Sequence, residues 1–272
     1  MIDLHTHSKY SRHAVGEIDD LVIFAIRRGV KILAITDHAP FPYDTCNRLQ
    51  ECELADYCLT IEYARIKYAK EITILCGLEV DYSPTELNYV KELFKKVSVD
   101  YIIGSVHTIF IDNEKINIWD IEKLNNPMFI EKYFTSMAQL ISSQLFDAVA
   151  HPDAILRGGI SPELFKQHIM QLAPLMIKYG VAYEVNTSCM RKEKYDSGMR
   201  KKVEGDGKYL GALALPYLAH QGVKLSIGSD AHCPSDVGVD TDALLGDLLK
   251  LKGNVVYFAR RQAIPITSKI HL

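Results

Sequence analysis

Short apolar runs alternate with helix-like segments along almost the whole chain of 272 residues. Seven runs have the length of buried strands and are too short for helices. They cover residues 2–5, 31–36, 72–78, 99–106, 147–150, 181–185 and 223–228. Each is followed by a segment with helical character, several of which end at glycine. These segments cover residues 17–28, 47–70, 85–97, 129–145, 162–179, 210–221 and 243–252, with a short last strand at 255–258.

Strands that alternate with helices over a whole chain predict an α/β fold with a parallel sheet. Seven such units suit a closed barrel of the TIM type, or an incomplete relative of it. A doubly wound open sheet is the alternative, and the periodicity alone does not decide between them. Because no internal repeat, low-complexity tract or linker interrupts the pattern, we expect one domain over residues 1–272.

The composition indicates a cytoplasmic globular protein. A net charge of −3 gives no electrostatic reason to expect nucleic acid or an anionic membrane as an obligate partner. No apolar run reaches the roughly 20 residues that span a bilayer, and no basic segment precedes a signal-like apolar run. The six cysteines form no C-x-x-C pair, so we expect free thiols in a reducing compartment.

Metal-ligand residues gather at the ends of the apolar runs. In an extended strand His5 and His7 point to the same face. Six of the seven runs end in histidine or acid, namely His5 with His7, His38, Glu79, His107, His151, and Asp230 with His232. His13 follows His7 closely. Because all strand ends of a parallel barrel open on one face, seven of the ten histidines would converge on one cleft.

The ligand types narrow the metal and the chemistry. Imidazole and carboxylate without thiolate suit Zn²⁺, Mn²⁺ or Fe. The ligands are too many for one ion, so two or three divalent ions are implied. Glu79 is the natural bridge, because a carboxylate can bind one ion through each oxygen. Ions about 3.5–4 Å apart are suited to the hydrolysis of phosphate esters.

The ordered motifs resemble those of the polymerase-and-histidinol-phosphatase (PHP) superfamily over nearly the whole chain. They are H-x-H at 5–7, T-D-H at 36–38, G-x-E at 77–79, S-V-H at 105–107, H-P at 151–152 and G-S-D-A-H at 228–232. The resemblance implies a distorted (β/α)₇ barrel with a three-ion centre. TDHAPFP at 36–42, GLEVDY at 77–82 and NTS at 186–188 resemble the histidinol-phosphate phosphatase branch.

The resemblance also implies which residues hold each ion. The first ion would take His5, His7, Glu79 and Asp230, the second Glu79, His107 and His151, and the third His13, His38 and His232. Asp37 would orient the ligating imidazoles. The segment 11–14 around His13 departs from the pattern of the branch, although the histidine itself is present.

Phosphate recognition usually needs arginine, whose planar fork matches two phosphate oxygens. Arg157 and Arg191 follow runs five and six and resemble phosphate-binding arginines of the family; solvated ion pairs are the alternative. Asn186 and Ser188 are weaker candidates for substrate contact. The basic segment 191–202 is either a solvated loop or a funnel for an anion. The loops 39–47 and 108–126 are placed to cover the site, and His168, His220 and His271 are expected to be structural.

Together the motifs imply an enzyme that hydrolyses L-histidinol phosphate in histidine biosynthesis. A hydroxide that bridges metal ions would attack phosphorus in line. One alternative is a PHP phosphoesterase for another small phosphate ester or a nucleotide, because fold and site do not decide the substrate. Another is a metal-binding regulatory module without turnover. The expected partner is a small phosphate ester, and the sequence leaves a homo-oligomer open.

Overall fold

The computed structural model describes residues 1–112, 114–196 and 198–266. Its main sheet has nine strands, which stand across the sheet in the order of the chain. They are β1 (Ile2–Asp3), β2 (Ile32–Ile35), β3 (Thr73–Asp81), β4 (Tyr101–Ser105), β7 (Ala148–Val149), β8 (Ala182–Asn186), β11 (Lys224–Gly228), β12 (Asn254–Ala259) and β13 (Gln262–Pro265). All neighbours are parallel except β12 and β13.

The first seven strands of this sheet curl until β1 lies beside β11. The Leu4 amide donates to the Ile227 carbonyl at 2.8 Å, and the His7 amide donates to the Ala231 carbonyl at 2.8 Å. A doubly wound sheet reverses its strand order at a switch point, whereas here the order follows the chain throughout. The predicted distorted (β/α)₇ barrel is therefore confirmed, and the open-sheet alternative is not.

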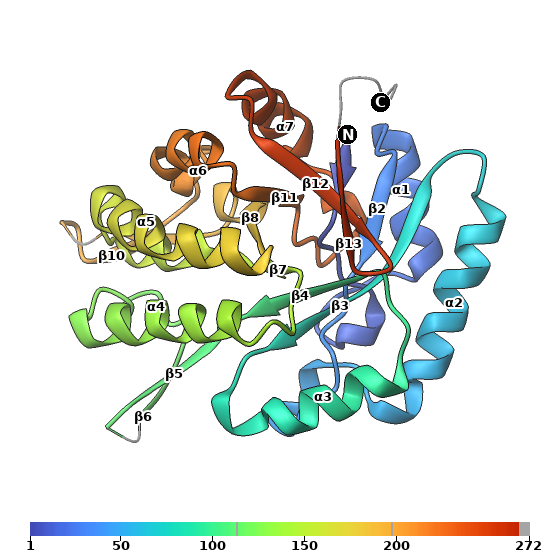
Figure 1. The fold of residues 1–272 in the computed structure, drawn as a ribbon, viewed down its shortest axis with the longest axis horizontal. Helices are drawn as coiled ribbons and strands as arrows, with labels where there is room; N and C mark the ends of the chain where they lie inside the picture. Colours follow the sequence, from blue (N-terminus) through green and yellow to red (C-terminus); the bar gives the residue numbers. More distant parts are fainter. Residues whose placement is uncertain (113, 197, 267–272) are drawn as a thin grey trace.

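A helix follows each of the seven barrel strands and covers the outside of the sheet (Figure 1). The helices are α1 (Ile18–Arg28), α2 (Leu54–Lys67), α3 (Leu87–Lys96), α4 (Pro127–Ser142), α5 (Pro162–Tyr179), α6 (Leu215–Gln221) and α7 (Thr241–Lys250). The helix expected from residue 47 begins later, because Gln50 and Glu53 form a capping box around a short turn before α2. Among the described residues, no helix combines the length and apolarity needed to cross a bilayer.

Helix α1 illustrates how the sequence builds this outer layer. Glu17 and Asp20 form a capping box at its start, and Gly29 ends it in the left-handed conformation at φ 83°. Leu21 and Ala25 are buried on the same side of the helix. A buried leucine contributes about 1.5–3 kcal/mol relative to an exposed one, so this face fastens α1 to the barrel.

Two hairpins lie in segments that the sequence predicts as irregular. β5 (Thr108–Ile111) pairs with β6 (Glu114–Asn117), and β9 (Lys194–Asp196) pairs with β10 (Lys201–Val203). The prediction of a loop at 108–126 was wrong for its first part, where buried and exposed side chains alternate as in a strand. Ile109 and Ile111 are buried and Phe110 between them is exposed. Both hairpins follow strand ends, at the face of the barrel where the predicted ligands lie.

Candidate metal centre

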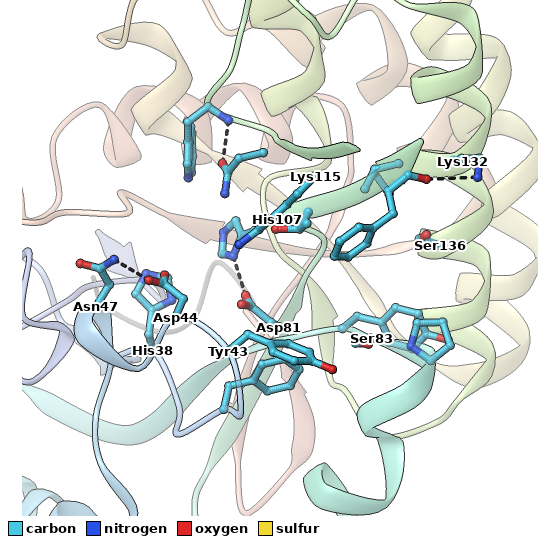
Figure 2. Close-up of a pocket in the computed structure, with 18 of the residues that line it drawn as sticks. His38, Tyr43, Asp44, Asn47, Asp81, Ser83, His107, Lys115, Lys132 and Ser136 are labelled. Atoms are coloured by element: carbon cyan, nitrogen blue, oxygen red, sulfur yellow. Dashed lines mark hydrogen bonds and ion pairs between the residues drawn. The ribbon is translucent and has the colours of Figure 1, made fainter. Parts of the chain in front are cut away.

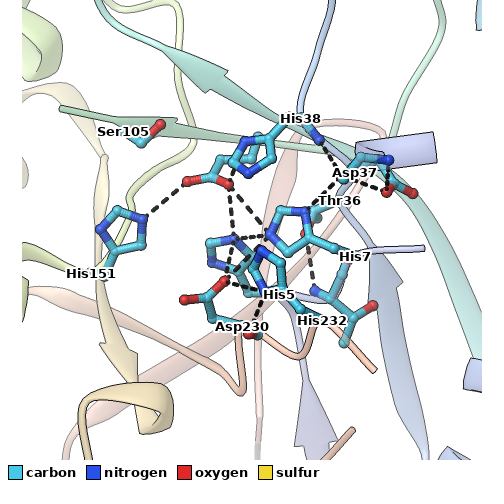
Figure 3. A network of polar contacts seen from close by, with 12 residues as sticks. His5, His7, Thr36, Asp37, His38, Ser105, His151, Asp230 and His232 are labelled. Atoms are coloured by element: carbon cyan, nitrogen blue, oxygen red, sulfur yellow. Dashed lines mark hydrogen bonds and ion pairs between the residues drawn. The ribbon is translucent and has the colours of Figure 1, made fainter. Parts of the chain in front are cut away.

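The seven histidines and two acids predicted as ligands lie together at one end of the barrel. Figure 3 labels His5, His7, His38, His151, His232 and Asp230 among them. Glu79 lies within β3, and the other ligand positions follow the ends of their strands. Glu79 is in the centre of the group. Its Oε1 lies 3.0 Å from His151 Nε2 and 3.3 Å from His107 Nε2. Its Oε2 lies 3.0 Å from His38 Nδ1 and 3.3 Å from His5 Nε2. Oε2 also lies 3.4 Å from His7 Nε2, so the two oxygens face different sets of imidazoles.

Three pairs of histidines face one another through their Nε2 atoms. The distances are 3.1 Å for His5 and His7, 3.3 Å for His107 and His151, and 3.0 Å for His13 and His232. Two nitrogens that bind one tetrahedral ion at about 2.1 Å are roughly 3.4 Å apart. The three spacings are therefore close to those of nitrogens that share a metal ion.

Buried lone pairs without a proton donor support the same conclusion. His38 Nδ1 is buried and forms no hydrogen bond, although it lies 3.0 Å from a carboxylate oxygen of Glu79. Asp230 directs Oδ1 toward His7 Nε2 at 3.4 Å and toward His232 Nδ1 at 3.5 Å. Unpaired buried acceptors are costly in a protein and are satisfied by a bound cation. These residues therefore fit a metal centre.

The distances between ligand atoms are compatible with more than one assignment of the ligands to individual ions. Within the part of the chain that the structure describes, three groups have ligand atoms that all lie within 4.8 Å of one another: His5, His7 and Asp230; His7, His38 and His232; and His38, Glu79 and His107. His38 thus belongs to two of the groups. The exposed His13 belongs to none of the three and approaches the centre through its contact with His232.

Two acids that the sequence reading missed hold the imidazoles from behind. Glu184 on β8 accepts from His5 Nδ1 at 2.7 Å and from the His151 amide at 2.6 Å. Asp81 at the end of β3 lies 2.5 Å from His107 Nδ1. An acid behind a ligating imidazole fixes its tautomer and directs the opposite nitrogen toward the metal. The sequence did hold a signal for both acids. Glu184 is the one charged residue in the apolar run 181–185, and Asp81 closely follows the run 72–78.

Asp37 acts through serines and not through direct contact with an imidazole. Its Oδ1 accepts from the Ser11 hydroxyl at 2.6 Å, and its Oδ2 accepts from the Ser8 hydroxyl at 2.7 Å. The Ser11 hydroxyl also lies 3.0 Å from His7 Nδ1. Burial raises the pKa of Asp37 to about 6, and these hydrogen bonds oppose that rise. The predicted orienting role of Asp37 is thus relayed through Ser11.

Burial and mutual charge shift the pKa values in the centre. Burial disfavours the charged form of His5, but Glu184 and Glu79 outweigh it and raise the pKa of His5 well above its usual value. Burial together with His232 and His38 lowers the pKa of His7 well below normal. Burial lowers the pKa of His38 to about 3. His7 and His38 therefore favour the neutral form that binds metals, whereas the neighbouring carboxylates favour the charged form of His5.

Two ligand positions have strained backbone. His151 has φ 30° and Asp230 has φ 51°, both in the left-handed region that non-glycine residues rarely adopt. Such strain costs about 1–3 kcal/mol and persists where surrounding structure enforces it. Gly228, two residues before Asp230, has no room for a side chain, because a Cβ there would lie 2.4 Å from the Cβ of His5 and 2.5 Å from Oε1 of Glu184.

The predicted phosphate arginines differ in their surroundings. Arg157 is buried, donates from Nε to the Glu193 carbonyl at 2.7 Å, and has a buried Nη1 without a partner. Arg191 is bonded to the framework, through Thr187 Oγ1 at 3.2 Å and the Ser229 carbonyl at 3.2 Å. Both arginines line a cavity of about 370 Å³ that reaches Glu79 and Asp230.

The weaker substrate candidates are buried and already engaged. Asn186 caps the turn that follows β8 and donates to Glu184 Oε2 at 3.1 Å. Ser188 lines the cavity and donates to Asp230 Oδ2 at 3.0 Å. Asn186 therefore supports the centre, whereas Ser188 faces it.

A wider cleft of about 1000 Å³ adjoins this cavity (Figure 2). His38, His107 and Trp119 line both hollows. The walls of the cleft come from the loop after β2, from hairpin β5–β6 and from α4, with Tyr43 and Lys132 among its residues. The two loops expected to cover the site thus do so.

His168 and His220 lie away from the centre. His168 in α5 stacks on Phe134, with ring centroids 4.2 Å apart. His220 is in the last turn of α6. Both positions agree with the predicted structural role, and His271 lies outside the described residues.

Known proteins are similar to this chain in sequence and in fold. The PHP domain model matches residues 3–188. A probable histidinol-phosphatase of Deinococcus radiodurans is 26% identical over 272 residues, covering 97% of this chain and 99% of that protein. One of Schizosaccharomyces pombe is 28% identical over 268 residues, covering 88% and 83%.

Among solved structures, the histidinol phosphate phosphatase of Lactococcus lactis, complexed with zinc, L-histidinol and phosphate, superimposes with a TM-score of 0.79. The two sequences are 16% identical, and the match covers 97% of this chain and 98% of that one. That likeness supports the barrel fold. Since the family model covers more than half of the residues, the chain belongs to the PHP domain family.

Proposed function

We propose that this protein is a metal-dependent phosphomonoesterase that hydrolyses L-histidinol phosphate to L-histidinol and phosphate. The observation that carries the proposal is the convergence of seven histidines with Glu79 and Asp230 at the open end of the barrel. The two relatives named probable histidinol-phosphatase, matched over 99% and 83% of their lengths, support this substrate. The reaction belongs to histidine biosynthesis, and we expect it in the cytoplasm.

The proposed centre holds three divalent ions of Zn, Mn or Fe. His5, His7, Glu79 and Asp230 would hold the first, Glu79, His107 and His151 the second, and His13, His38 and His232 the third. The zinc in the Lactococcus lactis protein is consistent with this donor set. Bound ions lower the pKa of water and neutralise phosphate charge, which is the chemistry that phosphate ester hydrolysis requires.

The residues of the chain orient and enclose the reactants. Glu184, Asp81 and the Asp37–Ser11 pair hold the imidazole rings, so their inner nitrogens keep free lone pairs. Arg157 has an unpaired buried Nη1 donor that suits a phosphate oxygen. Arg191 borders the same cavity. The alcohol product would leave through the wider cleft, which adjoins the cavity.

A substrate panel tests this function. The rates for L-histidinol phosphate would be compared with those for 2-aminoethyl phosphate, which lacks the imidazole, and imidazole glycerol phosphate, which lacks the amine. One phosphodiester completes the panel, with added Mn²⁺ or Zn²⁺. We expect kcat/KM to be highest for L-histidinol phosphate by at least about a hundredfold. A site that hydrogen-bonds a polar group of its substrate rejects an analogue without that group, because its own polar atoms are then left unpaired.

A flat panel would contradict histidinol phosphate as the substrate and leave a general phosphatase of this family. No turnover of any ester by metal-loaded protein would contradict the enzyme and favour a regulatory metal-binding module.

A further inference from the structure

Lys192 lines the cavity beside the predicted metal ligands, and it belongs to the basic segment 191–202, for which the sequence leaves open a solvated loop or a funnel for an anion. Its Nζ donates to Asp230 Oδ2 at 2.7 Å. The same Nζ lies 4.6 Å from the centroid of the Trp119 ring. A cation over an indole face is held there by the electrons of the ring. Lys192 therefore has a defined position toward the centre.

This ammonium group has donors to spare. A lysine ammonium carries three hydrogens, and Asp230 accepts one of them. Across residues 1–112, 114–196 and 198–266, no second side-chain acceptor for Lys192 is present. The remaining donors adjoin the cavity that Glu79, Ser188 and Arg157 also line.

A second cation shares the same aromatic ring. The guanidinium carbon of Arg157 lies 5.2 Å from the centroid of Trp119, and its buried Nη1 has no acceptor. Two like charges beside one ring repel each other unless an anion lies between or near them. Arg157 and Lys192 together thus present unused hydrogen-bond donors to one small cavity.

Asp230 separates the lysine from the ligand side of the centre. Its Oδ1 faces His7 and His232, while its Oδ2 takes Lys192 and Ser188. Lys192 can therefore remain bonded to Asp230 while that residue binds an ion through the other oxygen. Its free donors stay directed at whatever occupies the cavity.

The neighbouring arginine is less free to act. Arg191 bonds to Thr187 and Ser229 and lies 3.6 Å from Asp240 Oδ2. Moving its guanidinium into the cavity would break these contacts. Within the NTS-x-x-R-K segment, the structure thus turns the lysine toward the site and ties the arginine to the barrel.

We propose that Lys192, positioned by Trp119, binds a phosphate oxygen of the substrate together with Arg157. This deepens the proposed phosphatase function and rests on it. Trp119 is a positioning residue, because it comes from the segment after β6 and contacts the two cations. Its ring would hold both side chains at the cavity when no anion is bound.

Inorganic phosphate is the probe, and Trp119 is its reporter because it is the only tryptophan in the chain. Phosphate would be titrated into metal-loaded protein, followed by tryptophan fluorescence and by calorimetry, with the metal content of every sample measured. We expect a saturable fluorescence change in the wild type. Lys192→Gln should weaken phosphate binding by about tenfold or more, as for a lost charge-assisted hydrogen bond.

Lys194→Gln is the matched control. It makes the same charge change two residues away, where Lys194 pairs with Asp206 at 2.8 Å. This variant should bind phosphate like the wild type. Lys192→Arg should restore most of the affinity, since it keeps the cation. In steady state, Lys192→Gln should raise KM more than it lowers kcat.

The role of Trp119 is tested with two substitutions, followed by calorimetry alone. Trp119→Phe keeps a weaker aromatic face and Trp119→Leu removes it, so phosphate affinity should fall in that order. Trp119 is 39% exposed, which makes both variants compatible with folding. Equal affinity in the wild type and Trp119→Leu would overturn the positioning role.

If Lys192→Gln binds phosphate as tightly as the wild type at equal metal content, Lys192 is only a partner of Asp230 and the proposal is wrong. Phosphate binding that depends on Lys192, without turnover of L-histidinol phosphate, would instead reject the proposed substrate alone. The two failures are therefore separate.

Discussion

Glu184 and His5 are 179 positions apart in the chain, yet Oε1 of Glu184 lies 2.7 Å from Nδ1 of His5. Both side chains are buried. The same carboxylate also accepts from the amide of His151 through its other oxygen. One acid on β8 therefore contacts two predicted ligands that come from distant parts of the chain.

The change Glu184→Gln should weaken metal binding by about 10–100-fold, as is typical for partners behind ligating imidazoles. The amide nearly preserves shape but removes the charge that holds the His5 Nδ1 proton. Competition with a chelator measures the loss. Glu163→Gln at the exposed start of α5 is the control. A wild-type metal affinity for Glu184→Gln would show that this contact does not tune the centre.

Glu79→Gln should lose bound metal and nearly all turnover, because both oxygens of Glu79 face ligand pairs. We expect turnover to fall about a thousandfold or more, since one transition-state contact alone is worth about 10²–10³-fold. Elemental analysis and steady-state kinetics check this result. Glu92→Gln on the surface of α3 is the matched control, and full activity in Glu79→Gln would disprove the centre.

The change His13→Ala should remove one ion and leave the others. His13 is the exposed member of the group and contacts the centre through Nε2 of His232 at 3.0 Å. Elemental analysis should show roughly one equivalent less metal, with a smaller loss of activity than for Glu79→Gln. An unchanged metal content would remove His13 from the ligand set.

Tyr57→Phe tests the support under the centre. The Tyr57 hydroxyl on α2 reaches the Gly77 carbonyl at 2.8 Å and the Ile35 carbonyl at 3.0 Å. Removing it should lower the free energy of unfolding by about 1–3 kcal/mol, because buried carbonyls lose their donor. Urea denaturation measures the change. Tyr63→Phe, at a residue 72% exposed, should differ from the wild type by at most about 0.5 kcal/mol.

His168 should make stability depend on pH. Burial against Phe134 lowers the pKa of His168, and Glu131 partly opposes this. The folded protein thus favours neutral imidazole, so this stabilisation is present above the unfolded pKa of about 6.5 and is lost as pH falls below it. Urea denaturation at pH 8 and pH 5 should show a smaller pH effect in His168→Gln. An identical effect in both proteins would contradict the assignment.

Much of the fold could be predicted because its signals are local. Each barrel strand is a short apolar run, and glycines such as Gly29 and Gly180 end helices at positive φ. The hairpins were missed because β5 and β9 have only four and three residues. Strands this short carry too few alternating positions for a reliable pattern.

The metal ligands could also be predicted, since strand ends place them on one face before any side chain is built. The residues behind them could not. Asp81 and Glu184 pair with imidazoles far away in the chain, and nothing local records that pairing. Arg191 and Lys192 are adjacent residues of like charge. The backbone direction after β8 decides that Lys192 donates to Asp230 and that Arg191 donates to the Ser229 carbonyl, and the sequence alone does not indicate that direction.

The contact of β1 with β11 has a consequence for biosynthesis. The amides of Leu4 and His7 donate to the carbonyls of Ile227 and Ala231, which stand 223 and 224 positions later in the chain. Translation proceeds from the N-terminus, so His5 and His7 are synthesised long before Asp230. The proposed set of ligands is therefore complete only once Asp230 and His232 have been made. The proposed ions would then bind late in synthesis or after it, when β1 can lie beside β11.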